Sequence, residues 1–308
     1  MSNKIRRQHY VWRKYLQPWT TKGKIWCRRN SAIYSTALMN VAQERDFYVP
    51  EPLNDVEKKL LRMDAASTKR PDIIQFVEDE ITLREVMFAA LDAARASDDA
   101  KDVERLETFI HNSEEEYQGL IEADGLANLA ELVAGRINWA ADEGRWRKFI
   151  LFYATQYLRT KRIQERIKRS LSANATRMGY SVERVFSVQR NFEVVRLCDG
   201  IYRTASLTLL RADGGTEFIT CDQPAFNVHA ALSPIEAPKL PHEFYYPVSP
   251  NYAVVMMEGQ KHVPVARVAT SQEVERYNEA MRAASLEQVF ARRREAFETT
   301  WRRAPGLA

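Results

Sequence analysis

A chain of 308 residues, of which 45% are hydrophobic and 28% charged, can bury one large core or two modest ones and has the composition of a globular protein. No apolar run reaches the roughly 18 residues that a membrane span needs, and the basic, aromatic amino terminus lacks the apolar centre of a secretory signal. The three cysteines are too few and too far apart for a disulfide framework or a thiolate metal cluster, so we expect a cytoplasmic protein without membrane contact.

The net charge of +4 is distributed unevenly along the chain. Residues 1–43 contain nine Lys or Arg and no acid, whereas residues 72–131 contain seventeen acids and four bases. Residues 145–169 contain nine bases, opposed by Glu165 alone. Two interpretations remain open. The blocks attract one another across the fold, or the two basic segments form one positive surface for a polyanion such as nucleic acid or a nucleotide.

Residues 1–50 form an aromatic and basic arm that lacks sustained helical periodicity. The stretch QHYVWRKYLQPW, residues 8–19, combines one histidine with four aromatic rings and two bases. Either the rings anchor the arm to the rest of the protein, or His9 belongs to a site. A short strand is predicted at Lys24–Cys27.

Residues 51–178 are helical in character. Asn54 and Glu57 have the spacing of a capping box, and Pro71 suits the first turn of the following helix. The clearest helix covers residues 144–171. Its first half predicts a buried stripe at helical spacing, formed by Trp146, Phe149, Ile150, Tyr153 and Tyr157.

Four arginines of this predicted helix share another face: Arg159, Arg162, Arg166 and Arg169. Like charges at this spacing repel one another unless carboxylates or an anion neutralise them. The stripe therefore predicts either contact with the acidic helices or a surface that binds phosphate.

From residue 179 to 270 the pattern favours strands. Alternating or β-branched runs predict strands within residues 181–197, and Asp213-Gly214-Gly215 predicts the turn of a hairpin over residues 206–222. Residues 243–258 predict two further strands, joined by a turn at Ser249–Asn251. Helical periodicity returns in the carboxyl-terminal part, residues 271–308.

The expected fold is therefore α+β, a helical middle packed with a carboxyl-terminal antiparallel sheet and terminal helices. We expect a single domain over residues 1–308 with four parts, namely 1–50, 51–178, 179–270 and 271–308.

Most sequence signatures of catalysis are missing. The chain has no Gly-rich phosphate loop, no His or Cys spacing typical of zinc and no serine-hydrolase elbow. We therefore assign no metal ligands, and the sequence indicates no particular cofactor. Chemistry based on histidine must use one of five residues: His9, His111, His229, His242 and His262.

The segment FITCDQP, residues 218–224, is a predicted strand that ends in an acid. Asp222 either projects into a cleft from the strand end or caps its own turn through the backbone amides of that turn. Pro224 fixes the direction of the chain after it.

Five short motifs occur in a characteristic order: His9-Tyr10 with Tyr15-Leu16, Arg159-Thr160, Thr220–Pro224, Pro247–Pro250 and Tyr277-Asn278. Their order resembles an uncharacterised, mainly bacterial family known as a domain of unknown function. Its members carry a His-Tyr-x-Pro-x-x-Tyr-Leu opening and a Thr-Ser-Asp-Asn-Pro motif. The chain departs from that pattern at Trp12, Lys161, Cys221 and Gln223. The resemblance identifies candidate residues and supplies no reaction.

We assign His9, Asp222 and Asn278 as candidate catalytic residues, because a carboxylate beside an imidazole supports acid–base chemistry. The candidate substrate-binding residues are Gln8, Tyr10, Tyr15, Arg159 and Arg162, where the arginines would bind a phosphate. The same polar set could instead lock the arm onto the domain.

Two functional hypotheses follow. The first is a nuclease-like hydrolase that acts on phosphodiesters of nucleic acid or nucleotides, as an effector in bacterial defence or a toxin–antitoxin system with a regulatory protein partner. The second is a non-catalytic module that binds nucleic acid or a protein. The sequence does not predict the oligomeric state.

Overall fold

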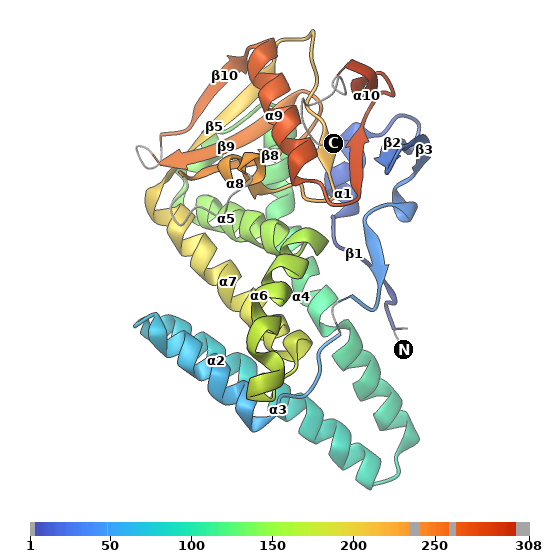
Figure 1. Cartoon of the computed structure of the whole chain (residues 1–308), viewed down its shortest axis with the longest axis vertical. Helices are drawn as coiled ribbons and strands as arrows, with labels where there is room; N and C mark the ends of the chain where they lie inside the picture. The colour runs from blue at the N-terminus through green and yellow to red at the C-terminus, as the bar shows by residue number, and fades with distance from the viewer. Residues whose placement is uncertain (1–3, 48, 234–240, 259–262, 300–308) are drawn as a thin grey trace. The chain divides into compact units, whose positions relative to one another are not determined.

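The computed structural model describes residues 4–47, 49–233, 241–258 and 263–299 (Figure 1). The chain divides into two compact units. Unit 1 contains Met1–Gln8, Glu44–Glu122 and Ile163–Leu197, and unit 2 contains His9–Gln43, Ala123–Arg162 and Cys198–Ala308. The α+β prediction is confirmed, whereas the single domain over residues 1–308 stays a prediction. In the described part of the chain, no helix combines the length and the apolar composition that a bilayer span requires.

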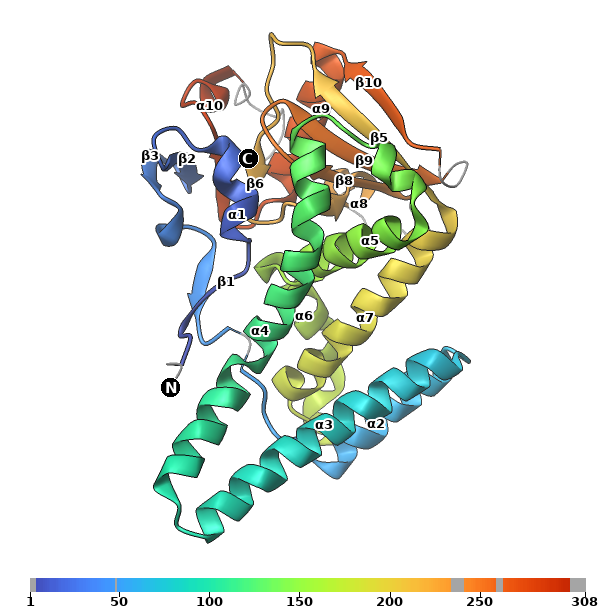
Figure 2. The same cartoon turned by 180° about the vertical axis from the view of Figure 1, so that it is seen from behind.

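Unit 1 is helical. It contains α2 and α3 and parts of three further helices, and the full bounds are α2 Asp55–Ser67, α3 Pro71–Ala96, α4 Ala100–Val133, α6 Lys161–Met178 and α7 Val182–Thr204. The predicted capping box is confirmed, since the Asn54 side chain accepts from the Glu57 amide and the Glu57 side chain accepts from the Asn54 amide. Pro71 begins α3 as predicted. Helices α2 and α3 lie side by side in opposite directions (Figure 2).

The strands predicted within residues 181–197 are wrong, because this segment forms α7. Val185, Val188 and Phe192 follow one another at helical spacing and pack against Leu61 of α2 and Val77 of α3. Burial of this apolar face in unit 1 outweighs the strand preference of the β-branched residues.

A buried ionic cluster joins three helices of unit 1. The Glu114 carboxylate of α4 pairs with Arg190 of α7 at 2.5 Å and lies 3.6 Å from Arg84 of α3. Burial, followed by the charge of Glu114, raises the pKa of nearby Glu80. Opposite charges thus meet inside this unit, but neither arginine belongs to the basic blocks 1–43 and 145–169, so this cluster does not test the two interpretations of the charge blocks.

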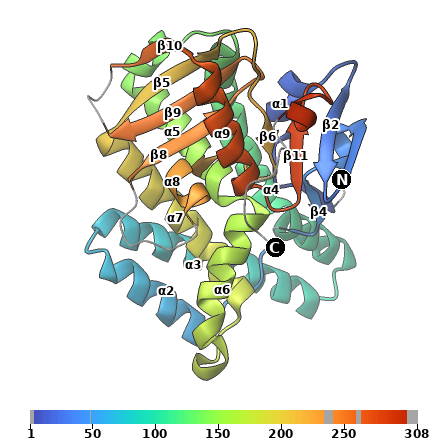
Figure 3. The ribbon, with the colours of Figure 1, turned by 45° about the horizontal axis from the view of Figure 1, so that its top comes forward.

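Unit 2 contains two larger sheets. The five-stranded sheet has the order β10-β5-β9-β8-β7, with bounds β5 Ala205–Ala212, β7 Phe226–Asn227, β8 Glu243–Pro247, β9 Tyr252–Glu258 and β10 Val265–Ala269 (Figure 3). The four-stranded sheet has the order β3-β2-β11-β6, with bounds β2 Lys24–Arg29, β3 Ala32–Ala37, β6 Thr220–Cys221 and β11 Gln288–Ala291. Two short strands, β1 Arg7–His9 and β4 Gln43–Arg45, pair separately.

The remaining elements are short helices and two longer ones in unit 2. Their bounds are α1 Arg13–Leu16, α5 Glu143–Leu158, α8 Val228–Leu232, α9 Ser271–Ala284 and α10 Ala296–Thr299, with 3-10 turns at Gln17–Trp19, Leu38–Asn40 and Asn138–Ala141.

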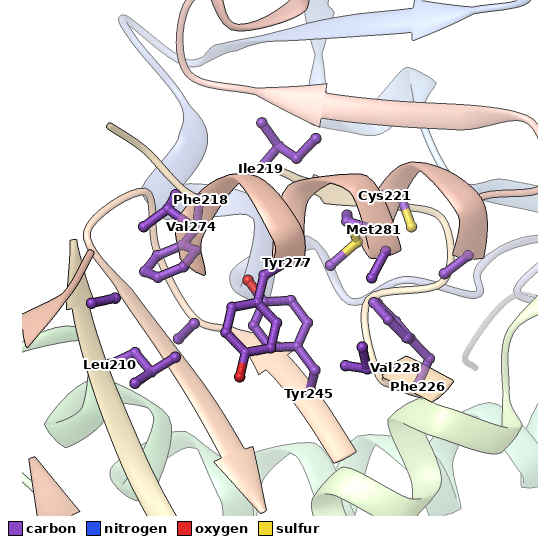
Figure 4. Packing of buried hydrophobic residues seen from close by; sticks show 14 of the residues in the cluster. Leu210, Phe218, Ile219, Cys221, Phe226, Val228, Tyr245, Val274, Tyr277 and Met281 are labelled. Atoms are coloured by element: carbon purple, nitrogen blue, oxygen red, sulfur yellow. The ribbon is translucent and has the colours of Figure 1, made fainter. Parts of the chain in front are cut away.

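Strand β8 is buried on both faces because a helix covers each one. Phe244 and Tyr246 meet Tyr153 of α5, with ring centres 6.1 and 5.9 Å apart. Tyr245 points to the other face and stacks on Tyr277 of α9 at 4.6 Å (Figure 4). Side chains alternate across a strand, so this one strand ties both helices to the sheet.

Several other predictions are confirmed in unit 2. The strand at Lys24–Cys27 is part of β2, and the two strands within residues 243–258 are β8 and β9. Ser249 accepts hydrogen bonds from two following amides, as expected of the predicted turn. The apolar stripe of α5 is buried, although Tyr157 remains partly exposed.

Three element predictions are wrong in part, each because a distant partner intervenes. The helix predicted over residues 144–171 breaks at Arg159-Thr160, so Arg159 lies outside the helix that carries Arg162, Arg166 and Arg169. The predicted hairpin does not form, since β5 pairs with β9 and β10 while β6 pairs with β11. The carboxyl-terminal helix ends at Ala284, and β11 follows it; residues 300–308 lie outside the described residues.

The capping box generates a stability prediction. Replacing Asn54 by alanine removes the acceptor for the Glu57 amide, so we expect the free energy of unfolding to fall by about 1 kcal/mol. Chemical denaturation of the full chain measures the change. Lys59→Ala, at an exposed position of the same helix, is the control, and equal stability of the two variants would contradict the capping role.

Candidate functional site

The aromatic arm is anchored by hydrogen bonds as well as by ring packing. The Tyr15 hydroxyl lies 2.7 Å from the Thr220 hydroxyl, and its ring stacks on Tyr246 at 4.9 Å. The Trp19 indole donates to the Phe218 carbonyl at 2.9 Å. Tyr15 is fully buried, and burial raises its pKa well above its ordinary value. The contacts of Tyr15 are therefore those of an anchor.

Tyr10 is held from the opposite end of the chain. The Gln288 side chain donates to the Tyr10 hydroxyl at 3.2 Å and accepts from the Ala42 amide at 3.3 Å. The backbone amide of Tyr10 donates to the Ala42 carbonyl at 3.0 Å. Strand β11 and the arm are thus joined through one buried glutamine.

Asp222 binds backbone amides. One carboxylate oxygen accepts from the Leu286 amide at 2.9 Å, and the other accepts from the Glu287 and Gln288 amides at 2.7 and 3.0 Å. Burial raises the pKa of this carboxyl to about 6, and the three amides partly oppose the shift. The interpretation of Asp222 as a cap on the backbone amides of its own turn is wrong, because the three amides that it binds lie more than sixty residues away.

Asn278 of α9 docks its helix onto the segment before β6. Its side-chain oxygen accepts from the Ile219 amide at 3.0 Å, and its side-chain nitrogen donates to the Glu217 carbonyl at 2.9 Å. The side-chain amide of Asn278 therefore accepts from one backbone N–H and donates to one backbone carbonyl, as the backbone of a neighbouring strand would. Both polar atoms of the side chain have backbone partners.

Arg162 and Lys161 bind the segment that follows α9. Arg162 donates to the carbonyls of Ala283 and Ser285 at the carboxyl end of this helix, where a cation is stabilised by the helix dipole. Lys161 pairs with Glu287 at 2.9 Å, and Arg29 pairs with the other oxygen of Glu287 at 2.6 Å. These bonds to Lys161 and Arg29 lower the pKa of Glu287 against the effect of its partial burial.

Arg159 and Thr160 mark the break between α5 and α6 through buried contacts. Arg159 donates to the His9 carbonyl at 2.6 Å, and Thr160 donates to the Gln223 side chain. Gln223 in turn donates to the Tyr157 carbonyl at 3.1 Å. The Arg159-Thr160 motif thus meets the arm and the Thr220–Pro224 motif within unit 2.

His9 lies beside Arg159 but not in hydrogen-bond contact with Asp222, whose described bonds all go to the backbone. Burial, followed by the charge of Arg13, lowers the pKa of His9 to about 4, against the effect of a hydrogen bond that the ring donates to the Val41 backbone. Its Nδ1 atom is buried and has no hydrogen-bond partner among the described residues. His9 is therefore a neutral imidazole at pH 7.

Of the eight predicted site residues, seven lie in unit 2, whereas Gln8 is buried and belongs to unit 1. The predicted catalytic pair of His9 and Asp222 does not assemble by hydrogen bonding, and Asp222, Asn278 and Arg162 hold backbone groups instead. The roles assigned to these residues in catalysis and substrate binding stay predictions. No group of three or more potential metal ligands occurs among the described residues.

Sequence reasoning missed two polar side chains. Gln288 was assigned to a helix, although the Val289-Phe290 pair that follows it has strand preference. Gln156 is fully buried in α5, and neither of its amide atoms has a hydrogen-bond partner among the described residues. Nothing in the sequence indicates that Gln156 is buried. A glutamine among the apolar residues of a helix also suits the exposed face of that helix.

Fold and site define an α+β protein in which short sequence motifs, far apart in the chain, interlock through buried polar contacts. A family model described as "Protein of unknown function (DUF4238)" matches residues 7–295, and the chain belongs to this family. The resemblance to an uncharacterised domain of unknown function is thereby confirmed, while the bacterial origin stays a prediction. No curated protein and no solved structure gives a significant match.

The Asp222 geometry predicts that an amide cannot replace the carboxylate. Asp222→Asn keeps one acceptor oxygen and presents N–H groups to backbone amides, so we expect the free energy of unfolding to fall by about 1–3 kcal/mol. Chemical denaturation measures it. The control is Glu279→Gln, which also replaces a carboxylate by an amide but at an exposed position of α9. If Asp222→Asn lowers the free energy of unfolding no more than the control does, the bonds from Asp222 to the three amides do not stabilise the fold.

His9 predicts a dependence of stability on pH. The folded-state pKa of His9, about 4, lies below its ordinary value of 6.5, so between these pH values the unfolded chain binds a proton that the folded chain does not. This contribution to stability is therefore present above pH 6.5 and is lost as the pH falls toward 4.

We expect the stability of the wild type, relative to His9→Gln, to decrease between pH 7 and pH 4.5. Denaturation at several pH values, with His242→Gln as the control histidine, measures the difference. A difference that stays constant with pH would contradict the neutral, buried His9.

Proposed function

We propose that the protein is a nucleic-acid-binding module whose contact surface is the segment Arg13–Arg29 of unit 2. This segment contains six bases and no acid. The observation that carries the proposal is that Arg13, Lys14, Lys22 and Lys24 are all exposed and have no ion-pair partner among the described residues. Unpaired cations on one short segment attract phosphates and release bound counterions.

A tight turn holds two of these lysines in place. Thr21 and Lys24 exchange two backbone hydrogen bonds, of 2.8 and 3.1 Å, around Lys22 and Gly23. Both central residues have positive φ, 52° and 74°, which is the conformation of a two-residue hairpin turn. Lys22 and Lys24 are thus presented by a fixed loop, at low entropic cost to a ligand.

An aromatic ring accompanies the bases of α1. The Lys14 ammonium lies 5.7 Å from the centre of the Trp12 ring, which is partly exposed. Single-stranded nucleic acids bind to surfaces that combine cations with rings on which bases stack. The combination favours RNA or DNA over a simple anion.

The hydrolase remains the second candidate, supported by one observation. Nδ1 of the His9 imidazole has no hydrogen-bond partner among the described residues, and the buried guanidinium of Arg159 donates to the His9 backbone carbonyl. A neutral imidazole can act as a general base, although its low pKa of about 4 makes His9 a weak one. A role as a toxin or defence effector, with a regulatory partner, belongs to this second candidate.

We further propose that the protein acts in the cytoplasm. Its three cysteines are free thiols, and two of them, Cys27 and Cys221, are buried. Free, buried thiols suit a reducing compartment.

The binding proposal predicts a charge-dependent loss of affinity. For Lys22→Glu/Lys24→Glu we expect at least tenfold weaker binding of a 20-nucleotide single strand, and a salt dependence smaller by about two counterions, measured by fluorescence anisotropy. The control is Lys59→Glu/Lys101→Glu, which makes the same charge change in exposed residues of unit 1.

Equal affinity of the two double variants, or binding insensitive to salt, would overturn the proposal. The same samples decide about catalysis. Cleavage of the oligonucleotide that disappears in His9→Gln would establish the hydrolase in place of the non-catalytic module.

A further inference from the structure

The histidine–carboxylate pair that the sequence predicts at His9 and Asp222 occurs elsewhere in unit 2. His229 of α8 places Nε2 at 3.3 Å from a carboxylate oxygen of Glu243 on β8. Glu243 is 4% exposed, whereas the side chain of His229 is 37% exposed. The pair therefore consists of a buried acid and an accessible imidazole.

Two residues of α9 complete the cluster. Arg276 binds both oxygens of Glu243, at 2.8 and 2.6 Å, and the Tyr277 hydroxyl donates to one of them at 2.8 Å. The Tyr277 ring is fixed by its stack on Tyr245. The Arg276 side chain is 42% exposed, so it is accessible from solvent although it binds the buried carboxylate of Glu243.

The geometry of His229 is set by a third polar residue. Asn227 precedes α8 and accepts from the amides of His229 and Glu243 at 3.1 and 3.4 Å, while it donates to the Pro241 carbonyl at 3.1 Å. One side chain thus holds the start of α8 against the start of β8. The imidazole and the carboxylate are positioned by the backbone as well as by their own contact.

The charge of Glu243 decides which nitrogen of His229 is available. Burial alone would raise the pKa of Glu243, but the bonds from Arg276 and Tyr277 outweigh it and lower the pKa. An ionised carboxylate attracts the imidazole, and Nε2 is the ring nitrogen that faces Glu243, at ion-pair distance. Nδ1 has no partner among the described residues and is left for a ligand.

We propose that His229 and Arg276 form a surface site for a phosphate group. Arginine offers planar N–H donors that fit the oxygens of phosphate, and only two of its five N–H groups are directed at Glu243. Nδ1 of a neutral imidazole accepts from the hydroxyl of a singly protonated phosphate. A protonated imidazole donates to a doubly charged one. Since a phosphate group changes protonation near pH 6–7, it can offer the ring either a hydroxyl donor or a fully ionised acceptor.

This site is independent of the basic segment Arg13–Arg29 and does not rest on the proposed function. A comparison of phosphate with sulfate distinguishes a specific phosphate site from simple charge attraction, because sulfate is an anion of similar shape that carries no proton near neutral pH. Sulfate can therefore pair only with protonated imidazole.

The test is a titration with sodium phosphate at pH 7 and constant ionic strength, followed by NMR of the histidine rings and backbone amides of the full chain. We expect the ring signals of His229 and the amides of Asn227 and Ala230 to shift to saturation at millimolar phosphate. Sulfate should bind at least threefold more weakly. His229→Gln should weaken phosphate binding at least fivefold, as read from the amides.

Arg276→Gln would leave the Glu243 carboxylate buried without its main partner, so Arg276→Lys is the variant of choice. Lysine keeps the charge and loses the planar fork, and we expect at least fivefold weaker binding. The control is Arg267→Gln, since Arg267 binds both oxygens of Glu273 in the same manner but has no histidine beside that carboxylate.

The proposal is overturned if the His229 signals do not saturate, if sulfate matches phosphate, or if His229→Gln and Arg267→Gln bind alike. Lys22→Glu/Lys24→Glu should bind phosphate at this site as the wild type does. That variant distinguishes failure of this site from failure of the nucleic-acid surface.

Discussion

The carboxylate of Asp222 is the constraint on which unit 2 depends. Its two oxygens accept from three consecutive amides at Leu286–Gln288, the point where the chain leaves α9 and enters β11. Strand β11 lies between β2 and β6, so the four-stranded sheet is continuous only when this turn is correctly placed. A buried carboxylate with satisfied hydrogen bonds specifies that placement more strictly than apolar packing would.

Three other polar side chains reinforce the same junction. Gln288 joins β11 to Tyr10, Asn278 docks α9 on the segment before β6, and Arg162 binds the carbonyls at the end of α9. Each of these side chains replaces water at a backbone or hydroxyl group that folding would otherwise bury unpaired. Asp222, Asn278 and Arg162, which the sequence suggests as site residues, thus bind backbone groups of unit 2, while their assigned roles in catalysis and substrate binding stay predictions.

A ligand from solution can bind only to groups that these buried contacts leave accessible. Two such groups are the four exposed bases Arg13, Lys14, Lys22 and Lys24, which have no ion-pair partner among the described residues, and the imidazole of His229 beside Arg276. They differ in kind. The first is a set of spaced charges along a segment, suited to a polymer, whereas the second is a positioned pair suited to a single phosphate group.

The sequence by itself determined features whose physics is local. The capping box needs only Asn54 and Glu57, the start of α3 needs only Pro71, and the strands within residues 243–258 follow from local runs of aromatic and apolar residues. The order of short motifs also predicted the family. Tertiary structure decided the rest: α7 is helical because its apolar face meets α2 and α3, and β11 exists because β2 and β6 flank it. The partners of Asp222 lie 64 to 66 residues away, and no local pattern encodes which backbone amides a carboxylate will find once the chain has folded.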